Sequence, residues 1–81
     1  MEDITINIDE IYVPSGRRGD LDMDTVSSLA ESILEEGLQT PISVRHDGKR
    51  YVLVTGLHRL EACKALGEAS ITAILVGTPK H

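Results

Sequence analysis

The sequence contains no tryptophan and no phenylalanine, and only two of its 81 residues are tyrosine. The core must therefore be built from isoleucine, leucine, valine and alanine. The scarcity of aromatic rings also argues against a protein that binds single-stranded nucleic acid by base stacking. A chain of this length forms one small domain, which buries only about 60–65% of its unfolded surface and so has a thin core.

Cysteine and long apolar segments are scarce as well. The single cysteine excludes an internal disulfide, and no group of cysteine and histidine has the spacing of a zinc site. No apolar run approaches the roughly 18 residues of a membrane span, and the acidic N-terminus lacks the apolar segment of an export signal. We therefore expect a cytoplasmic protein that does not associate with a membrane.

Positive charge is scarce in the first half of the chain. Residues 1–40 carry ten acidic residues and two arginines, whereas residues 41–81 carry three acidic residues and six lysines and arginines. The net charge of −5 predicts weak non-specific binding to duplex DNA, because that affinity comes largely from neutralised phosphates. An acidic helix face exposed to solvent would account for much of this asymmetry.

Two segments have the apolar spacing of an amphipathic helix. The first, residues 23–36, follows the N-cap residue Asp22 and ends at Gly37. Its apolar side chains predict one buried stripe of Val26, Leu29, Ala30, Ile33 and Leu34. The second helix is expected at residues 57–66, with Leu60, Cys63 and Leu66 facing inward.

The remaining patterns predict about four strands. They are residues 4–8, continued to 13 directly or through a turn, then 42–45, 51–55 and 71–76. The pair Asp47-Gly48 between the second and third strands is a hairpin signal. We therefore expect an α+β domain over residues 1–76, with a small mixed sheet and two main helices, followed by a tail or linker at 77–81.

The turn between the third strand and the second helix is the strongest candidate for a site. A β-branched run ends at Thr55, Gly56 follows, and His58 and Arg59 fall in the first helical turn. The N-terminus of a helix presents free N–H groups and a positive dipole end, both of which favour an anion. Two interpretations remain open: a phosphate-binding turn, or an ordinary strand-to-helix turn with a surface arginine.

A second candidate is the loop at residues 14–20. Arg17 and Arg18 are the two cations of the first half, and Gly16 and Gly19 flank them. The planar guanidinium group suits phosphate oxygens, so this loop could be an anion-binding arm. A solvated, flexible loop is the alternative.

Two runs of residues resemble the conserved boxes of the ParB N-terminal domain. The first is residues 32–44, which reads Ser-Ile-Leu-Glu-Glu-Gly-Leu-Gln-Thr-Pro-Ile-Ser-Val. The second is residues 51–62, whose Gly-Leu-His-Arg-Leu-Glu-Ala resembles the family pattern Gly-x-Arg-Arg-x-x-Ala. The boxes occur in the family's order and spacing, and the resemblance covers about residues 4–76. It implies the ParB/sulfiredoxin fold.

The resemblance also implies a nucleotide site. In this fold the glycine turn and its basic residues contact nucleotide phosphates, of CTP in ParB proteins and of ATP or ADP in other members. Phosphate contacts are therefore expected from Gly56, His58 and Arg59, with pocket walls from Gly37, Gln39, Thr40, Arg17 and Arg18. Many ParB proteins have glutamine where this chain has Thr40.

The match to sulfiredoxin differs at one informative position. Gly56-Leu57-His58-Arg59 is similar to the sulfiredoxin signature Gly-Cys-His-Arg, but the reactive cysteine would fall on Leu57. Cys63 lies six residues further along, at a position expected to be buried, where a thiolate is disfavoured. The sequence therefore argues against reduction of sulfinic acids.

The function expected from these residues and resemblances is a ParB-type module of a DNA-partition or DNA-regulatory protein. It would bind a nucleoside triphosphate, CTP or ATP, with Mg²⁺ as an accompanying ion and no metal site of its own. DNA would be contacted only through segments outside this chain or a partner protein, and a homodimer is left open. The alternatives are an ATP- or NTP-dependent phosphotransferase, NTPase or nuclease of the same fold, or a protein-interaction domain without nucleotide.

Overall fold

The computed structural model describes residues 3–14, 16, 19, 21–37 and 40–77 of the chain. Strands and helices within these ranges have the following bounds: β1 (Asp3–Asn7), the 3₁₀ turn η1 (Ile8–Glu10), β2 (Ile11–Tyr12), α1 (Met23–Glu36), β3 (Ile42–Asp47), β4 (Arg50–Thr55), α2 (Leu57–Ala65) and β5 (Ser70–Leu75). The architecture is α+β, as the sequence predicts.

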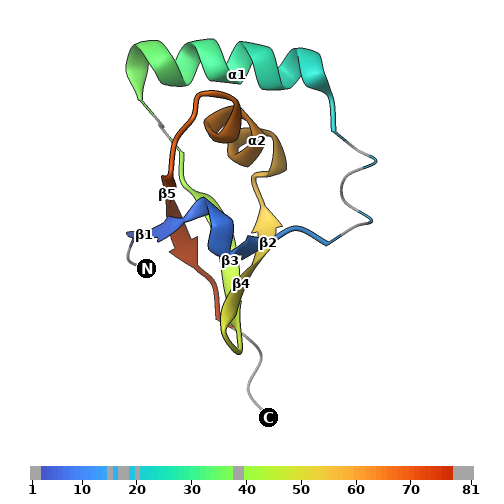
Figure 1. The fold of residues 1–81 in the computed structure, drawn as a ribbon, viewed down its shortest axis with the longest axis vertical. Coiled ribbons are helices and arrows are strands. Elements are labelled where there is room, and N and C mark those ends of the chain that lie inside the picture. The colour runs from blue at the N-terminus through green and yellow to red at the C-terminus, as the bar shows by residue number, and fades with distance from the viewer. Residues whose placement is uncertain (1–2, 15, 17–18, 20, 38–39, 78–81) are drawn as a thin grey trace.

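The strands form one mixed sheet in the order β1-β5-β3-β4-β2. β1 pairs antiparallel with β5, and β3 pairs antiparallel with β4 through the hairpin at Asp47-Gly48. β3 lies parallel to β5, and β2 lies parallel to β4. β1 and β2, although neighbours in sequence, therefore lie at opposite edges of the sheet (Figure 1).

The sheet has five strands rather than about four, because η1 divides the first apolar segment in two. The amide of Ile8 donates a hydrogen bond of 3.0 Å to the carbonyl of Ala69, which ends the pairing with β5 at this point. The 3₁₀ turn then redirects the chain so that Ile11 pairs with Tyr51 of β4. Ile6, before this break, and Ile8, its first residue, are both buried.

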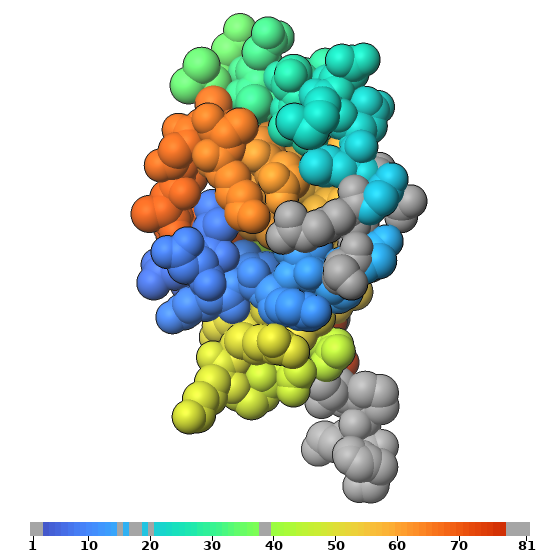
Figure 2. Space-filling model, turned by 45° about the vertical axis from the view of Figure 1, so that its right-hand side comes forward, coloured from blue at the N-terminus to red at the C-terminus, as the bar shows by residue number. Residues whose placement is uncertain are grey.

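The helix α2 packs on the sheet and α1 packs on α2, so that α2 lies between α1 and the strands (Figure 1). In the space-filling view α1 forms one end of the molecule, and the β3–β4 hairpin lies toward the other end (Figure 2). The helical bounds 23–36 agree with the sequence prediction. The predicted stripe on α1 is partly wrong: Leu34 is 75% exposed and Val26 is the helix's one buried residue.

The position of α1 explains this difference. It packs mainly against α2 rather than against the sheet, so only part of the apolar stripe is covered. α2, in contrast, buries Leu57, Leu60, Ala62 and Cys63. Apart from Cys63, every buried side chain among the described residues is aliphatic, as the missing aromatic residues predict.

Candidate functional site

Gly56 allows α2 to begin directly against β3. Its φ of 105° lies in the left-handed region, which side chains with a Cβ rarely adopt. A Cβ at this position would lie 2.6 Å from Cγ2 and 2.9 Å from Cβ of Ile42, which is fully buried. The strand-to-helix turn therefore requires glycine on two independent grounds.

The N-terminus of α2 has no side-chain cap. The amide of Leu60 closes the first helical turn on the carbonyl of Gly56 at 2.9 Å, so the amides of residues 57–59 have no carbonyl within the helix. Gly56 has no side chain to accept from them, and the first turn contains no acidic residue. Within the described part of the chain, no capping side chain and no acidic first-turn residue therefore compensates the donors and the positive dipole of this helix end.

The N-terminus of α1 is compensated within the chain. One carboxylate oxygen of Asp22 accepts from the amide of Asp24 at 3.1 Å, and the other accepts from Oγ1 of Thr25 at 2.8 Å. The hydrogen bond from Thr25 and then that from Asp24 lower the pKa of the Asp22 carboxyl below its usual value. α1 thus begins with its own anionic cap, whereas the first turn of α2 contains no acidic residue of its own.

Arg59, in the first turn of α2, carries a buried donor. Its Nε is inaccessible to solvent and has no hydrogen-bond partner among the described residues. A buried donor left without a partner costs about 1–3 kcal/mol. The side chain therefore gains most from a ligand that supplies an acceptor, and a phosphate oxygen is an acceptor of the required kind.

His58 connects the starts of the two helices. Its ring is half-buried, and Nε2 accepts a hydrogen bond of 2.9 Å from the main-chain N–H of Asp22, 36 residues earlier. A ring nitrogen that accepts carries no proton, so the geometry assigns a neutral imidazole with its proton on Nδ1. This contact cannot be predicted from the sequence, because nothing in the local pattern of either segment points to the other.

The other predicted site residues are only partly described. Thr40 is exposed and lies two positions before Ile42, the residue in contact with Gly56. Gly37 ends α1, where its amide donates to the carbonyl of Ile33 at 2.7 Å. Arg17, Arg18 and Gln39 lie outside the described residues. The structure brings Gly56, His58 and Arg59 together, and a role for any of these residues in nucleotide binding stays a prediction.

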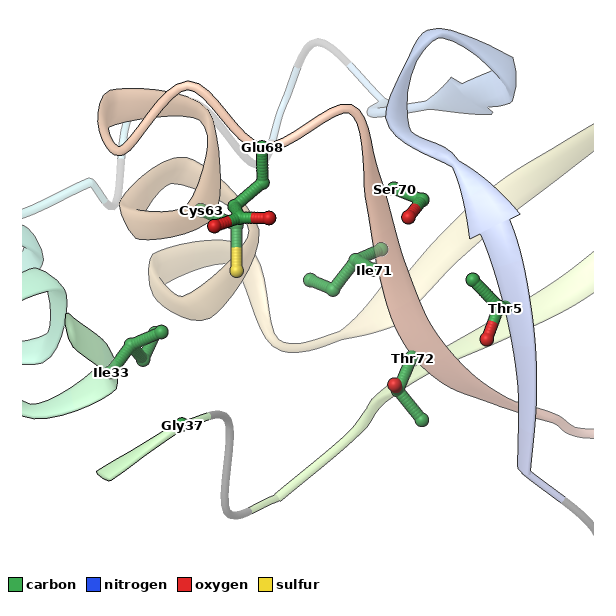
Figure 3. Close-up of a pocket in the computed structure, with 8 residues that line it drawn as sticks. All are labelled: Thr5, Ile33, Gly37, Cys63, Glu68, Ser70, Ile71 and Thr72. Atoms are coloured by element: carbon green, nitrogen blue, oxygen red, sulfur yellow. The ribbon is translucent and has the colours of Figure 1, made fainter. Parts of the chain in front are cut away.

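Gly37 also lines a separate hollow near the C-terminal part of α2. The hollow has a volume of about 240 Å³ and is lined by Thr5, Ile33, Gly37, Cys63, Glu68, Ser70, Ile71 and Thr72 (Figure 3). Cys63 is only 3% exposed, and burial raises the pKa of its thiol. Leu57, at the position of the sulfiredoxin cysteine, is 7% exposed and belongs to the core. Neither position offers a reactive thiolate.

Within the described ranges, no group of three or more histidine, cysteine, aspartate or glutamate side chains is arranged to hold a metal ion. None of the described helices combines the length and the apolar character needed to cross a membrane.

The family model and the related sequences that match this chain all describe ParB proteins. The family model described as the ParB N-terminal domain matches residues 1–81. A probable chromosome-partitioning protein ParB from Campylobacter jejuni is 39% identical over 71 residues, which is 86% of this chain and 26% of that protein. The corresponding protein from Helicobacter pylori is 36% identical over 74 residues, 90% of this chain and 26% of that protein. The chain thus spans about a quarter of the length of these relatives.

Solved structures share the fold. Sulfiredoxin from Arabidopsis thaliana has a TM-score of 0.87 at 29% identity, over 96% of this chain and 88% of that one. Truncated ParB from Caulobacter crescentus, complexed with CTP-gamma-S, has a TM-score of 0.82 at 21% identity, over 99% of this chain and 47% of that one. A free serine kinase in complex with ADP has a TM-score of 0.78 at 17% identity, over 94% of this chain and 31% of that one.

Proposed function

The chain belongs to the ParB N-terminal domain family, and from this premise we propose that it binds a nucleoside triphosphate whose phosphates lie at the N-terminus of α2. The observation that carries the proposal is the buried Nε of Arg59, which has no partner among the described residues and belongs to the first turn of a helix without a side-chain cap. The amides of residues 57–59 and the Arg59 guanidinium would donate to phosphate oxygens. His58 would take part through its main-chain N–H.

The rest of the pocket is proposed from the resemblance. Arg17 and Arg18 would add positive charge, and the segment with Gly37, Gln39 and Thr40 would form a wall. We favour CTP, because a ParB protein of this fold forms a complex with CTP-gamma-S, and keep ATP as the second choice. Mg²⁺ would be held largely by phosphate oxygens and water, an arrangement that needs no dedicated cluster of protein ligands.

We further propose that the nucleotide controls a longer partition protein. The relatives of this chain are chromosome-partitioning proteins about four times as long, so DNA would be contacted through segments beyond residues 1–81. A bound triphosphate can favour one arrangement of domains or of two subunits only by binding that arrangement more tightly. Such a protein would act in the cytoplasm.

The proposal is tested by titrating Mg·CTP, Mg·ATP and Mg·GTP into the ¹⁵N-labelled domain. We expect one nucleotide to shift the amide resonances of residues 57–59 in a saturable way. Arg59→Ala should weaken binding about 10- to 100-fold, since hydrogen bonds to charged groups contribute about 1.5–3 kcal/mol. Lys64→Ala is the matched control: it removes one positive charge at the other end of α2, where Lys64 contacts Glu61 at 3.4 Å, and should change the affinity about twofold at most.

Two outcomes would contradict the proposal. One is the absence of any shift at millimolar nucleotide, which would favour a protein-interaction domain. The other is an equal loss of affinity in the Arg59 and Lys64 variants, which would indicate a general charge effect. If a nucleotide binds, release of phosphate over hours distinguishes an NTPase from a module that only senses the bound nucleotide.

A further inference from the structure

We infer that the ring of His58 positions the proposed nucleotide site rather than binding phosphate. Its Nε2 holds the main chain at the start of α1 beside the start of α2, 2.9 Å from the amide nitrogen of Asp22. The nucleotide part of this inference rests on the proposed function, whereas the contact between the helices does not depend on it.

The hydrogen bond uses a donor that the helix itself cannot satisfy. Asp22 is the N-cap residue of α1, so its amide precedes the helical hydrogen-bond pattern. The Asp22 carboxylate is already occupied by Asp24 and Thr25. The imidazole therefore completes the start of α1 from another helix and connects the two chain segments directly.

The contact requires an imidazole that is unprotonated at Nε2. The carboxylate of Asp22 interacts electrostatically with the ring, and the guanidinium of Arg59 and the carboxylate of Glu61 are the charged groups nearest to it in the sequence. In a protonated ring, Nε2 carries a hydrogen and is a donor. It would then face the N–H donor of Asp22, and the hydrogen bond would be lost. A phosphate bound through Nε2 would require the same protonated nitrogen, so the two roles exclude each other.

The hydrogen bond between Asp22 and His58 holds the start of α1 beside the start of α2, where the phosphates are proposed to bind. Leu21, next to Asp22, packs against the hydrophobic core, so the chain immediately before α1 is held at two neighbouring residues. Asp22 is in turn hydrogen-bonded to His58, the residue preceding Arg59. Because the starts of α1 and α2 are held in place before the ligand binds, less conformational entropy is lost on binding.

A scalar coupling across the hydrogen bond tests the contact directly. In ¹⁵N-labelled protein we expect a coupling between the amide nitrogen of Asp22 and Nε2 of His58, and an Nε2 chemical shift typical of an unprotonated nitrogen. Both should persist in saturating Mg·CTP or Mg·ATP. Absence of the coupling in the nucleotide-free protein, or its loss when nucleotide binds, would overturn the inference.

Three substitutions distinguish the ring nitrogens. His58→Gln can place an acceptor near the position of Nε2, His58→Asn places its amide near Nδ1, and His58→Leu has neither. We expect the glutamine variant to keep the nucleotide affinity within about threefold and the other two to lose about tenfold or more, in line with one lost hydrogen bond. Hydrogen exchange of the Asp22 amide should stay slow in the glutamine variant and become fast in the other two.

The opposite pattern, in which asparagine rescues binding and glutamine does not, would assign a direct phosphate contact to Nδ1 and overturn the inference. Urea unfolding of all three variants shows whether each is folded. If wild-type protein binds none of the nucleotides and no pyrophosphate, the proposed function fails. The positioning role in nucleotide binding fails with it, and the coupling and the Asp22 exchange rates then decide whether His58 connects the two helices.

Discussion

At the scale of single residues, Gly56 carries the most stringent requirement in the chain. The sequence marks it as a turn, but the reason for glycine becomes visible only in the packing, where a Cβ would fall 2.6 Å from Cγ2 of Ile42. Ile42 is fully buried and belongs to β3, so it has little freedom to move aside. Gly56 therefore serves the fold whether or not a ligand binds beside it.

Gly56→Ala should lower the free energy of unfolding by about 2–5 kcal/mol, from left-handed strain of about 1–2 kcal/mol and overpacking of about 1–3 kcal/mol. Gly67→Ala is the matched control, because Gly67 also has a positive φ, of 80°, but no atom lies within 4 Å of its added Cβ. Its free energy of unfolding should fall only by the cost of the left-handed conformation, about 1–2 kcal/mol. Urea unfolding measures both, and equal losses would show that contact with Ile42 is unimportant.

At the scale of elements, the helices show what a local pattern can and cannot predict. The bounds 23–36 follow from signals within the segment: an N-cap at Asp22, a regular apolar spacing and Gly37. The exposure of Leu34 could not be predicted, because it depends on α1 packing against α2 instead of the sheet. The bond between His58 and Asp22 is hidden for the same reason, since it joins two elements that are independent in sequence.

The cap of α1 gives a prediction about pH. Hydrogen bonds from Thr25 and Asp24 lower the pKa of Asp22 below 3.8, so the folded state favours the charged carboxylate. A lowered pKa in the folded state contributes stability above pH 3.8 that is lost as the pH falls below this value. The stability of the wild type should therefore decline in this range more than that of Asp22→Asn, which keeps a capping acceptor but does not titrate.

Circular dichroism of the two proteins in urea, from pH 7 to pH 2.5, measures this difference. The midpoint urea concentration of the wild type, relative to that of the asparagine variant, should fall between about pH 4 and pH 2.5. A difference that stays constant over the whole range would show that the Asp22 carboxylate does not stabilise the helix through its charge.

At the scale of the whole molecule, the fold was more predictable than the site. The two boxes at residues 32–44 and 51–62 indicated the family, and the family model matches residues 1–81. The fifth strand was missed because η1 moves Ile11 to the far edge of the sheet, a long-range pairing that local alternation does not encode. The turn at Gly56 was found from its residues, but the uncapped end of α2 and the buried Nε of Arg59 required the structure.

The overall charge leads to a prediction about DNA. With a net charge of −5, the 81-residue domain should show no binding to plain duplex DNA at tens of micromolar protein and physiological salt, because non-specific affinity follows phosphate neutralisation. Fluorescence anisotropy with a labelled duplex of random sequence measures this. Micromolar binding by the domain alone would contradict both the charge argument and the assignment of DNA contacts to other segments.

The central claim is that Arg59 serves a phosphate ligand and not the fold. Thermal unfolding of the wild type and Arg59→Met, each with and without the nucleotide that binds most tightly, tests this claim most directly. We expect the nucleotide-free methionine variant to melt at or above the wild-type temperature, because it replaces a buried donor without a partner by an apolar chain of similar length.

With nucleotide at about 100 times its dissociation constant, the wild type should gain about 2.7 kcal/mol, while the variant should gain little. A variant that melts well below the wild type without nucleotide, or that is stabilised by nucleotide to the same extent, would contradict the claim.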